Sequence, residues 1–161
     1  MRIIGIDPGL RRTGWGVVDK TGSRLQFVAA GVIAVPAEPP TAERLAELFR
    51  QVSWVLDEFN PTLAAVEETF VNSNSRSSLT LAQARAIALI VPALRGLAVK
   101  EYATNLVKKS IVGNGHATKE QVQMMVARLL PKSGEQSFDA ADALAVAITA
   151  AHLEFFEANF N

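Results

Sequence analysis

The sequence predicts an α/β protein in which a mixed sheet carries helices on its faces. Three apolar segments separated by short turns open the chain, and helical and strand-like segments alternate after them. The chain has 161 residues, of which 49% are hydrophobic and 20% charged. This is the size and composition of one globular domain, which we expect to span residues 1–161.

Three strands are expected at the start of the chain. Residues 2–7 form an apolar run that Pro8 and Gly9 end, and residues 13–19 and 25–35 follow it after short turns. Short turns between consecutive strands favour an antiparallel meander.

Helical periodicity begins at Thr41, because apolar residues recur at intervals of three and four as far as Phe59. Residues 63–66 then form a short apolar strand that runs directly into Glu67. The polar residues 71–78 are expected to form a loop.

Residues 79–97 are predicted to form a helix that is apolar almost all round, which Pro92 kinks or breaks. Such a helix needs cover on more than one side, so we place it in the core or at a subunit interface. A further strand follows at residues 97–102. Three helices come after it: the first at about 105–112, the second opened by the capping box of Thr118 and Gln121, and the third at about 137–157.

The formal net charge is zero, but the charges are segregated along the chain. Residues 1–37 carry +3, residues 38–68 carry −5, residues 69–97 carry +3, residues 98–132 carry +4 and residues 133–161 carry −5. A basic face beside an acidic centre would suit nucleic acid, although charge blocks are also typical of ordinary solvated surface.

Several classes of protein are excluded by what the sequence lacks. It has no cysteine, which excludes disulfides and thiolate metal sites. It has neither a secretory h-region after a basic start nor an uncharged apolar run of roughly 18 residues. We therefore expect a soluble, cytoplasmic protein that does not enter a membrane.

Four acidic residues lie next to apolar segments, where a carboxylate is costly unless it is paired or binds a metal ion. Asp7 and Glu67 each end an apolar strand, and Asp139 and Asp142 lie one turn apart at the Ala-rich start of the last helix. Taken singly, Asp7 could be an ordinary turn residue, and Asp139 and Asp142 could simply stabilise a helix N-terminus through the helix dipole. Together the four acids indicate a site for hard cations such as Mg²⁺ or Mn²⁺. Two ions about 4 Å apart would support phosphoryl transfer. Without metal, we expect one or more of these acids to have a raised pKa.

Several motifs, in order over nearly the whole chain, resemble the RuvC family of Holliday junction resolvases. They are Gly5-Ile6-Asp7-Pro8-Gly9 with Thr13-Gly14-Trp15-Gly16, Ala65-Val66-Glu67-Glu68-Thr69-Phe70, Gln83-Ala84-Arg85, Tyr102 with Val107-Lys108, Val112-Gly113-Asn114-Gly115, and Asp139-Ala140-Ala141-Asp142-Ala143-Leu144-Ala145. The resemblance implies a ribonuclease H-like fold with a mixed five-stranded sheet flanked by helices. It also implies a homodimer that cuts four-way DNA junctions by paired, symmetric hydrolysis in recombination and repair.

The resemblance also implies roles for individual residues. The four acids match the family's catalytic, metal-binding residues, which hold two Mg²⁺ or Mn²⁺ ions per site. Lys108 and Lys119 match basic positions near the scissile phosphate, Phe70 matches an aromatic residue that stacks on a base, and Arg76 is a candidate phosphate contact. The branch-migration proteins RuvA and RuvB are the implied partners.

Three other functions remain open from the sequence. One is a ribonuclease H-like nuclease that acts on RNA or on hybrid duplexes. Another is a nucleotide-binding module related to sugar kinases and actin, because residues 6–9 also resemble their first phosphate motif; the chain is short for the second lobe that they need. The third is a protein that binds junctions without cutting them.

Overall fold

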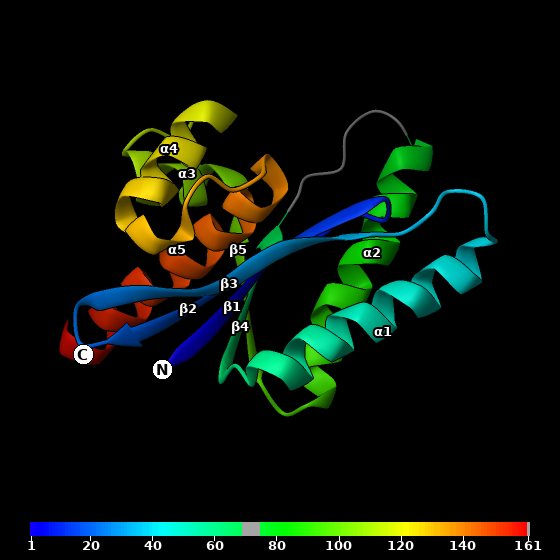
Figure 1. Cartoon of the computed structure of the whole chain (residues 1–161), viewed down its shortest axis with the longest axis horizontal. Helices are drawn as coiled ribbons and strands as arrows, with labels where there is room; N and C mark the ends of the chain where they lie inside the picture. Colours follow the sequence, from blue (N-terminus) through cyan, green and yellow to red (C-terminus); the bar gives the residue numbers. More distant parts are fainter. Residues whose placement is uncertain (69–74, 161) are drawn as a thin grey trace.

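The computed structural model describes residues 1–68 and 75–160, in which five strands form one mixed sheet (Figure 1). The strands are β1 (Arg2–Asp7), β2 (Arg12–Thr21), β3 (Arg24–Ala34), β4 (Leu63–Glu68) and β5 (Ala98–Ala103), in the order β3-β2-β1-β4-β5. The first three strands pair antiparallel, whereas β4 and β5 extend the sheet in parallel with β1. The predicted meander and mixed five-stranded sheet are confirmed.

Helices cover both faces of this sheet (Figure 1). One face carries α1 (Thr41–Phe59) and α2 (Ser75–Leu94); the other carries α3 (Thr104–Val112), α4 (Lys119–Leu129) and α5 (Phe138–Phe160), with a short 3₁₀ helix at Pro131–Ser133. Strand alternation divides the side chains between two cores. In β1, Ile3 packs with α3, α4 and α5, whereas Ile4 and Ile6 pack with α1 and α2.

The second helix differs from its predicted form at both ends. It begins at Ser75, so the prediction that residues 75–78 belong to a loop is wrong, because each residue added to an existing helix gains a backbone hydrogen bond despite its polar side chain. The Thr80 hydroxyl donates to the Arg76 carbonyl oxygen at 3.0 Å within this first turn. The helix also continues past Pro92 and ends at Leu94.

This helix also bears on the predicted absence of a membrane segment. In the described part of the chain, residues 76–94 are the one helical segment whose length and hydropathy would suffice to cross a bilayer. Core helices reach the same length and hydropathy, but only 22% of this segment is buried within the described part of the chain.

The last helix lies unusually close to the first two strands. A Cβ atom added to Gly5 of β1 would lie 2.0 Å from the Ala143 carbonyl oxygen and 2.7 Å from the Ala147 backbone nitrogen. Residues 140 and 141 and residues 143–148 are at most 1% exposed. The Ala-rich first half of α5 therefore packs directly on the strand backbone, and this close approach requires glycine on the strand.

Gly5→Ala is expected to destabilise the protein by about 2 kcal/mol or more, because helix backbone rather than a flexible side chain occupies the space of the new methyl group. Thermal or urea unfolding in EDTA measures the effect. Gly115→Ala is the matched control, since its Cβ would meet its nearest atom at 3.3 Å, the Asn105 carbonyl oxygen. Equal stability of the two variants would contradict the prediction.

Candidate active site

Two of the predicted acidic residues stand at the ends of neighbouring parallel strands. The register pairs Ile6 of β1 with Val66 of β4, so Asp7 and Glu67 follow side by side at the same edge of the sheet. Alternation along β4 leaves Glu67 only 8% exposed, whereas Glu68 is exposed. Of the two adjacent glutamates, only Glu67 therefore lies on the buried side of β4.

The turn after β1 is fixed by a buried threonine. Thr13 is 1% exposed, and its hydroxyl donates to the Gly9 carbonyl oxygen at 2.6 Å and accepts from the Gly9 amide at 3.2 Å. These two hydrogen bonds close the segment between Asp7 and β2, so the carboxylate of Asp7 is held on ordered backbone.

The first turn of α5 supplies the other two acids. The Ser137 hydroxyl accepts from the Ala140 amide at 3.3 Å, and the helix begins at the next residue, Phe138. Asp142 faces Glu67 across a hollow, whereas the Oδ2 atom of Asp139 accepts a hydrogen bond from Nε of Arg12 at 2.9 Å. Sequence reasoning did not find Arg12; its signal was only the pair of arginines after the turn that follows Asp7.

Burial and mutual repulsion disturb the ionisation of these acids. The pKa of Asp7 is raised well above its ordinary value, first by burial and then by the charge and hydrogen bond of Glu67, with smaller effects of Asp142 and Asp139. The pKa of Asp142 is raised to about 6, again by burial first and then by Glu67, while Lys119 and Lys108 oppose the rise. The prediction that one or more of these acids has a raised pKa is therefore confirmed at Asp7 and Asp142.

The two predicted lysines lie beside these acids. Lys108 and Lys119 line a hollow of about 110 Å³ together with Glu67 and Asp142. The predicted capping box is confirmed: the Thr118 hydroxyl accepts from the Gln121 amide at 3.2 Å, which fixes the turn of α4 from which Lys119 projects. Two lysines that are 11 residues apart in the sequence thus meet at one site.

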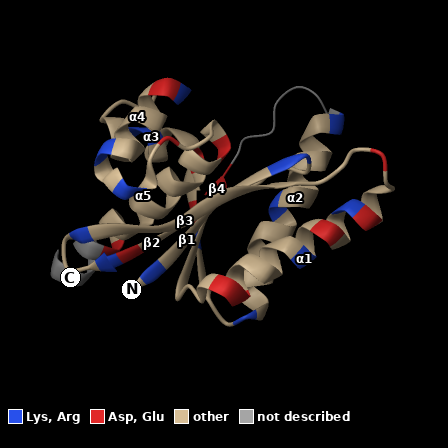
Figure 2. Cartoon of the chain, viewed as in Figure 1, with Lys and Arg blue, Asp and Glu red and all other residues tan. Residues whose placement is uncertain are grey.

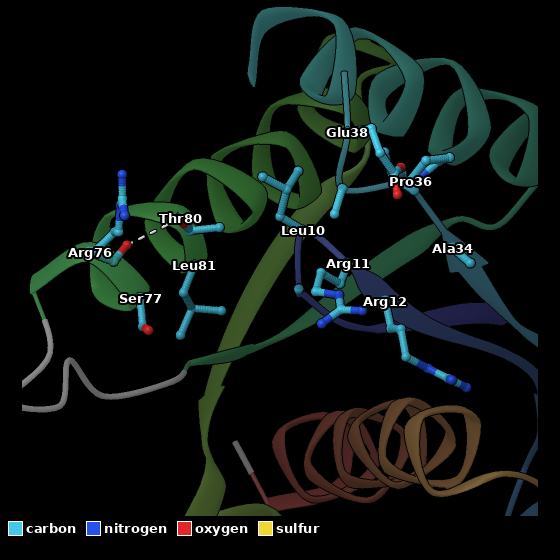
Figure 3. A pocket seen from close by; sticks show the side chains of 13 residues that line it. Leu10, Arg11, Arg12, Ala34, Pro36, Glu38, Arg76, Ser77, Thr80 and Leu81 are labelled. Atoms are coloured by element: carbon cyan, nitrogen blue, oxygen red, sulfur yellow. Dashed lines mark hydrogen bonds between the residues drawn. The ribbon is translucent and has the colours of Figure 1, made fainter. Parts of the chain in front are cut away.

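The remaining predicted residues lie elsewhere. Arg76, at the start of α2, lines a separate hollow of about 1110 Å³ between α2, the turn after β1 and the segment that follows β3 (Figure 3). Arg11 and Arg12 line the same hollow, so it is basic on two sides. Phe70 lies outside the described residues.

The acids suit divalent cations in chemistry, although they do not converge fully. Carboxylate oxygens are the ligands that Mg²⁺ and Mn²⁺ prefer, and burial together with neighbouring carboxylates raises the pKa values of Asp7 and Asp142, a cost that a bound cation would offset. Within residues 1–68 and 75–160, however, no three histidine or acidic side chains are grouped closely enough to hold one ion. Asp139, paired with Arg12, would have to turn to join the others.

The chain is similar to known proteins over nearly its full length. The model of the family described as "Crossover junction endodeoxyribonuclease RuvC" matches residues 3–150. The protein of that name from Xanthobacter autotrophicus is 59% identical over 152 residues, which are 94% of this chain and 90% of that protein.

Solved structures agree with this similarity. The Thermus thermophilus RuvC in complex with a Holliday junction substrate superposes with a TM-score of 0.90 and 31% identity, covering 98% of this chain and 96% of that one. A yeast mitochondrial Holliday junction resolvase, 11% identical, shares the fold with a TM-score of 0.68 over 97% of this chain and 83% of its own.

Proposed function

The chain belongs to the RuvC family of crossover junction endodeoxyribonucleases, and we propose that it resolves four-way DNA junctions by paired, symmetric hydrolysis of phosphodiester bonds, dependent on a divalent metal ion. The fold is the ribonuclease H-like fold of this family. The observation that carries the proposal is the superposition, at a TM-score of 0.90, on a relative whose structure contains a Holliday junction.

In this proposal Asp7, Glu67, Asp139 and Asp142 would hold two Mg²⁺ or Mn²⁺ ions. Bound there, the ions supply Lewis-acid activation of a water nucleophile and stabilise the leaving oxygen. Because the pKa of Asp7 and that of Asp142 are raised, protons would compete with a metal ion for these two carboxylates as the pH falls.

The lysines act on the phosphate rather than on the metal. Lys108 and Lys119 share a hollow with two of the acids, so their ammonium groups can donate to oxygens of the scissile phosphate as negative charge develops there. In this proposal Arg76, which lines the separate basic hollow, contacts a phosphate farther along the DNA strand. We assign base stacking to Phe70 by family resemblance alone.

The test is cleavage of a mobile four-way junction, a linear duplex and an RNA–DNA hybrid in Mg²⁺ or Mn²⁺, with the ends mapped. We expect two opposed cuts in the junction, with 5′-phosphate and 3′-hydroxyl ends. Equal activity on the three substrates would contradict junction resolution and would favour a general ribonuclease H-like nuclease.

We also propose that the enzyme is a homodimer that associates through α2. Arg85 is the one charged residue of this helix after its first turn, which leaves it mostly tan in Figure 2, whereas α1 carries both charge signs. Leu79, Ile90 and Leu94 are 61%, 48% and 67% exposed and lie on one side of the helix at helical spacing. A two-fold dimer would present two identical sites to two opposed strands.

Ile90→Glu is expected to weaken dimer association at least tenfold, because an unpaired carboxylate would be buried at the interface. Sedimentation equilibrium measures the association, and junction cleavage should lose its paired, symmetric pattern. The control is Met124→Glu, which places the same charge at a 49% exposed residue of α4, on the opposite face of the sheet. Equal association of both variants would contradict the assignment.

Three further expectations stay predictions: the single domain over residues 1–161, the cytoplasmic location, and association with RuvA and RuvB. The first is supported by the single sheet, which α5 at the end of the chain covers next to β1 at its start.

A further inference from the structure

One ion pair joins the start of a strand to the candidate metal site. Arg12 is the first residue of β2 and Asp139 lies in the first turn of α5, 127 residues later, with 2.9 Å between Nε and Oδ2. The distance between the two elements is set by close packing, because a Cβ atom on Gly14 would lie 2.0 Å from the Asp139 carbonyl oxygen. The pair is therefore held at the rim of the site by backbone contact.

The ion pair itself is weak and open to exchange. The Arg12 side chain is 61% exposed and that of Asp139 is 36% exposed. Exposed ion pairs contribute about 0–1 kcal/mol, since water and salt screen them. A divalent cation or a phosphate group can therefore displace either partner at little cost to the fold.

Arg12 also stands between two hollows on the surface. It lines the basic hollow of about 1110 Å³ with Arg11 and Arg76, and it lines a second hollow of about 620 Å³ with Lys119 and Asp139. In Figure 3 its side chain extends toward α5, whereas Arg11 points into the first hollow. A DNA strand that follows these basic residues past the acids would pass Arg12.

We propose that Arg12 is a positioning residue that exchanges partners during substrate binding. In the metal-free enzyme it holds the carboxylate of Asp139; when Asp139 turns toward the metal site, the guanidinium is released to a DNA phosphate. This inference rests on the proposed metal site and adds a coupling between metal and DNA. Metal binding releases Arg12 to contact a phosphate, and DNA binding to Arg12 releases Asp139 to bind metal. Such coupling is reciprocal by thermodynamic necessity.

The first test is Mn²⁺ binding to the DNA-free enzyme by titration calorimetry. Arg12→Ala should bind Mn²⁺ about three- to tenfold more tightly than the unsubstituted protein, because no internal cation then competes for Asp139. Arg12→Lys, which keeps the charge, should fall between the two. Because Arg12 is exposed, we expect unfolding temperatures in EDTA to change little.

The second test is junction affinity in EDTA and in Ca²⁺, with the absence of cleavage checked in the same samples. We compare the factor by which Ca²⁺ raises junction affinity over that in EDTA. This factor should be about five times larger for the unsubstituted protein than for Arg12→Ala. Arg11→Ala is the matched control: it removes the same charge from the adjacent exposed residue, so it should lower affinity equally in both conditions and leave the coupling intact.

The outcomes separate this inference from the proposed function. Mn²⁺ binding that Asp7→Asn does not weaken would overturn the metal site and the role of Arg12 together. Mn²⁺ binding that Asp7→Asn weakens but Arg12→Ala leaves unchanged would overturn the role of Arg12 alone. A coupling that Arg11→Ala and Arg12→Ala reduce equally would also overturn it, because general positive charge would then account for the effect.

Discussion

Asp7→Asn is expected to slow junction cleavage by about 10³-fold or more while leaving junction affinity in EDTA nearly unchanged. The amide has the shape of the carboxylate but lacks its charge, so the proposed metal site loses several kcal/mol of electrostatic stabilisation. The basic residues around the site, Lys108 and Lys119 among them, keep their positions, so DNA should still bind. Single-turnover cleavage and gel-shift affinity on the same junction measure the two effects.

Glu68→Gln provides the matched control for this substitution. Glu68 is also an acid at a strand end, directly after Glu67, but it is exposed and away from the hollow that Glu67 lines. Cleavage by Glu68→Gln should therefore stay close to that of the unsubstituted protein. Unchanged cleavage by Asp7→Asn would reject its role as a metal ligand. A junction-binding protein that does not cut would show no metal-dependent cleavage in any of the three proteins.

In EDTA, the stability advantage of Asp142→Asn over the unsubstituted protein is expected to grow by about 2 kcal/mol between pH 4 and pH 8. The pKa of Asp142 is raised from 3.8 to about 6, so the folded state holds a proton that the unfolded state has lost, and stability falls as pH rises through this window. The asparagine carries no proton to lose. Urea unfolding at several pH values measures the difference.

Comparing the two proteins at each pH removes the contribution of titrating groups that do not interact with Asp142. The pKa of His152 is lowered from its ordinary 6.5, so its contribution makes stability rise with pH in a window below pH 6.5. The pKa values of Asp19 and Asp57 are lowered from their ordinary 3.8, so these two groups change stability only below pH 3.8. All three are present in both proteins. A constant difference from pH 4 to pH 8 would show that Asp142 ionises normally.

Adding Mg²⁺ should reverse the order of stability at pH 8. The unsubstituted protein gains stability because Mg²⁺ binds its folded state, whereas Asp142→Asn has lost one proposed ligand and gains less. The carboxylates that lower stability without metal are thus those that the proposed mechanism requires. Equal stabilisation of both proteins by Mg²⁺ would contradict a ligand role for Asp142.

Local residue patterns were sufficient to predict much of this protein. The apolar runs that end at Asp7 and Glu67, the helical spacing from Thr41 to Phe59 and the Thr118 capping box each act over a few neighbouring residues, and the structure has the expected element at each. The suitability of the four acids as oxygen ligands for a hard cation also follows from residue type alone, without knowledge of the fold.

The tertiary structure decided which of these residues meet. The parallel pairing of β1 with β4 brings Asp7 beside Glu67, and the glycines of β1 and β2 let α5 approach, so that Asp142 reaches the same edge of the sheet. Burial at that edge then raises the pKa values. The pairing of Arg12 with Asp139 spans 127 residues, and no local pattern encodes a contact between side chains so far apart in the chain. The sequence determined the chemistry of the site, whereas long-range packing decided its geometry and its electrostatics.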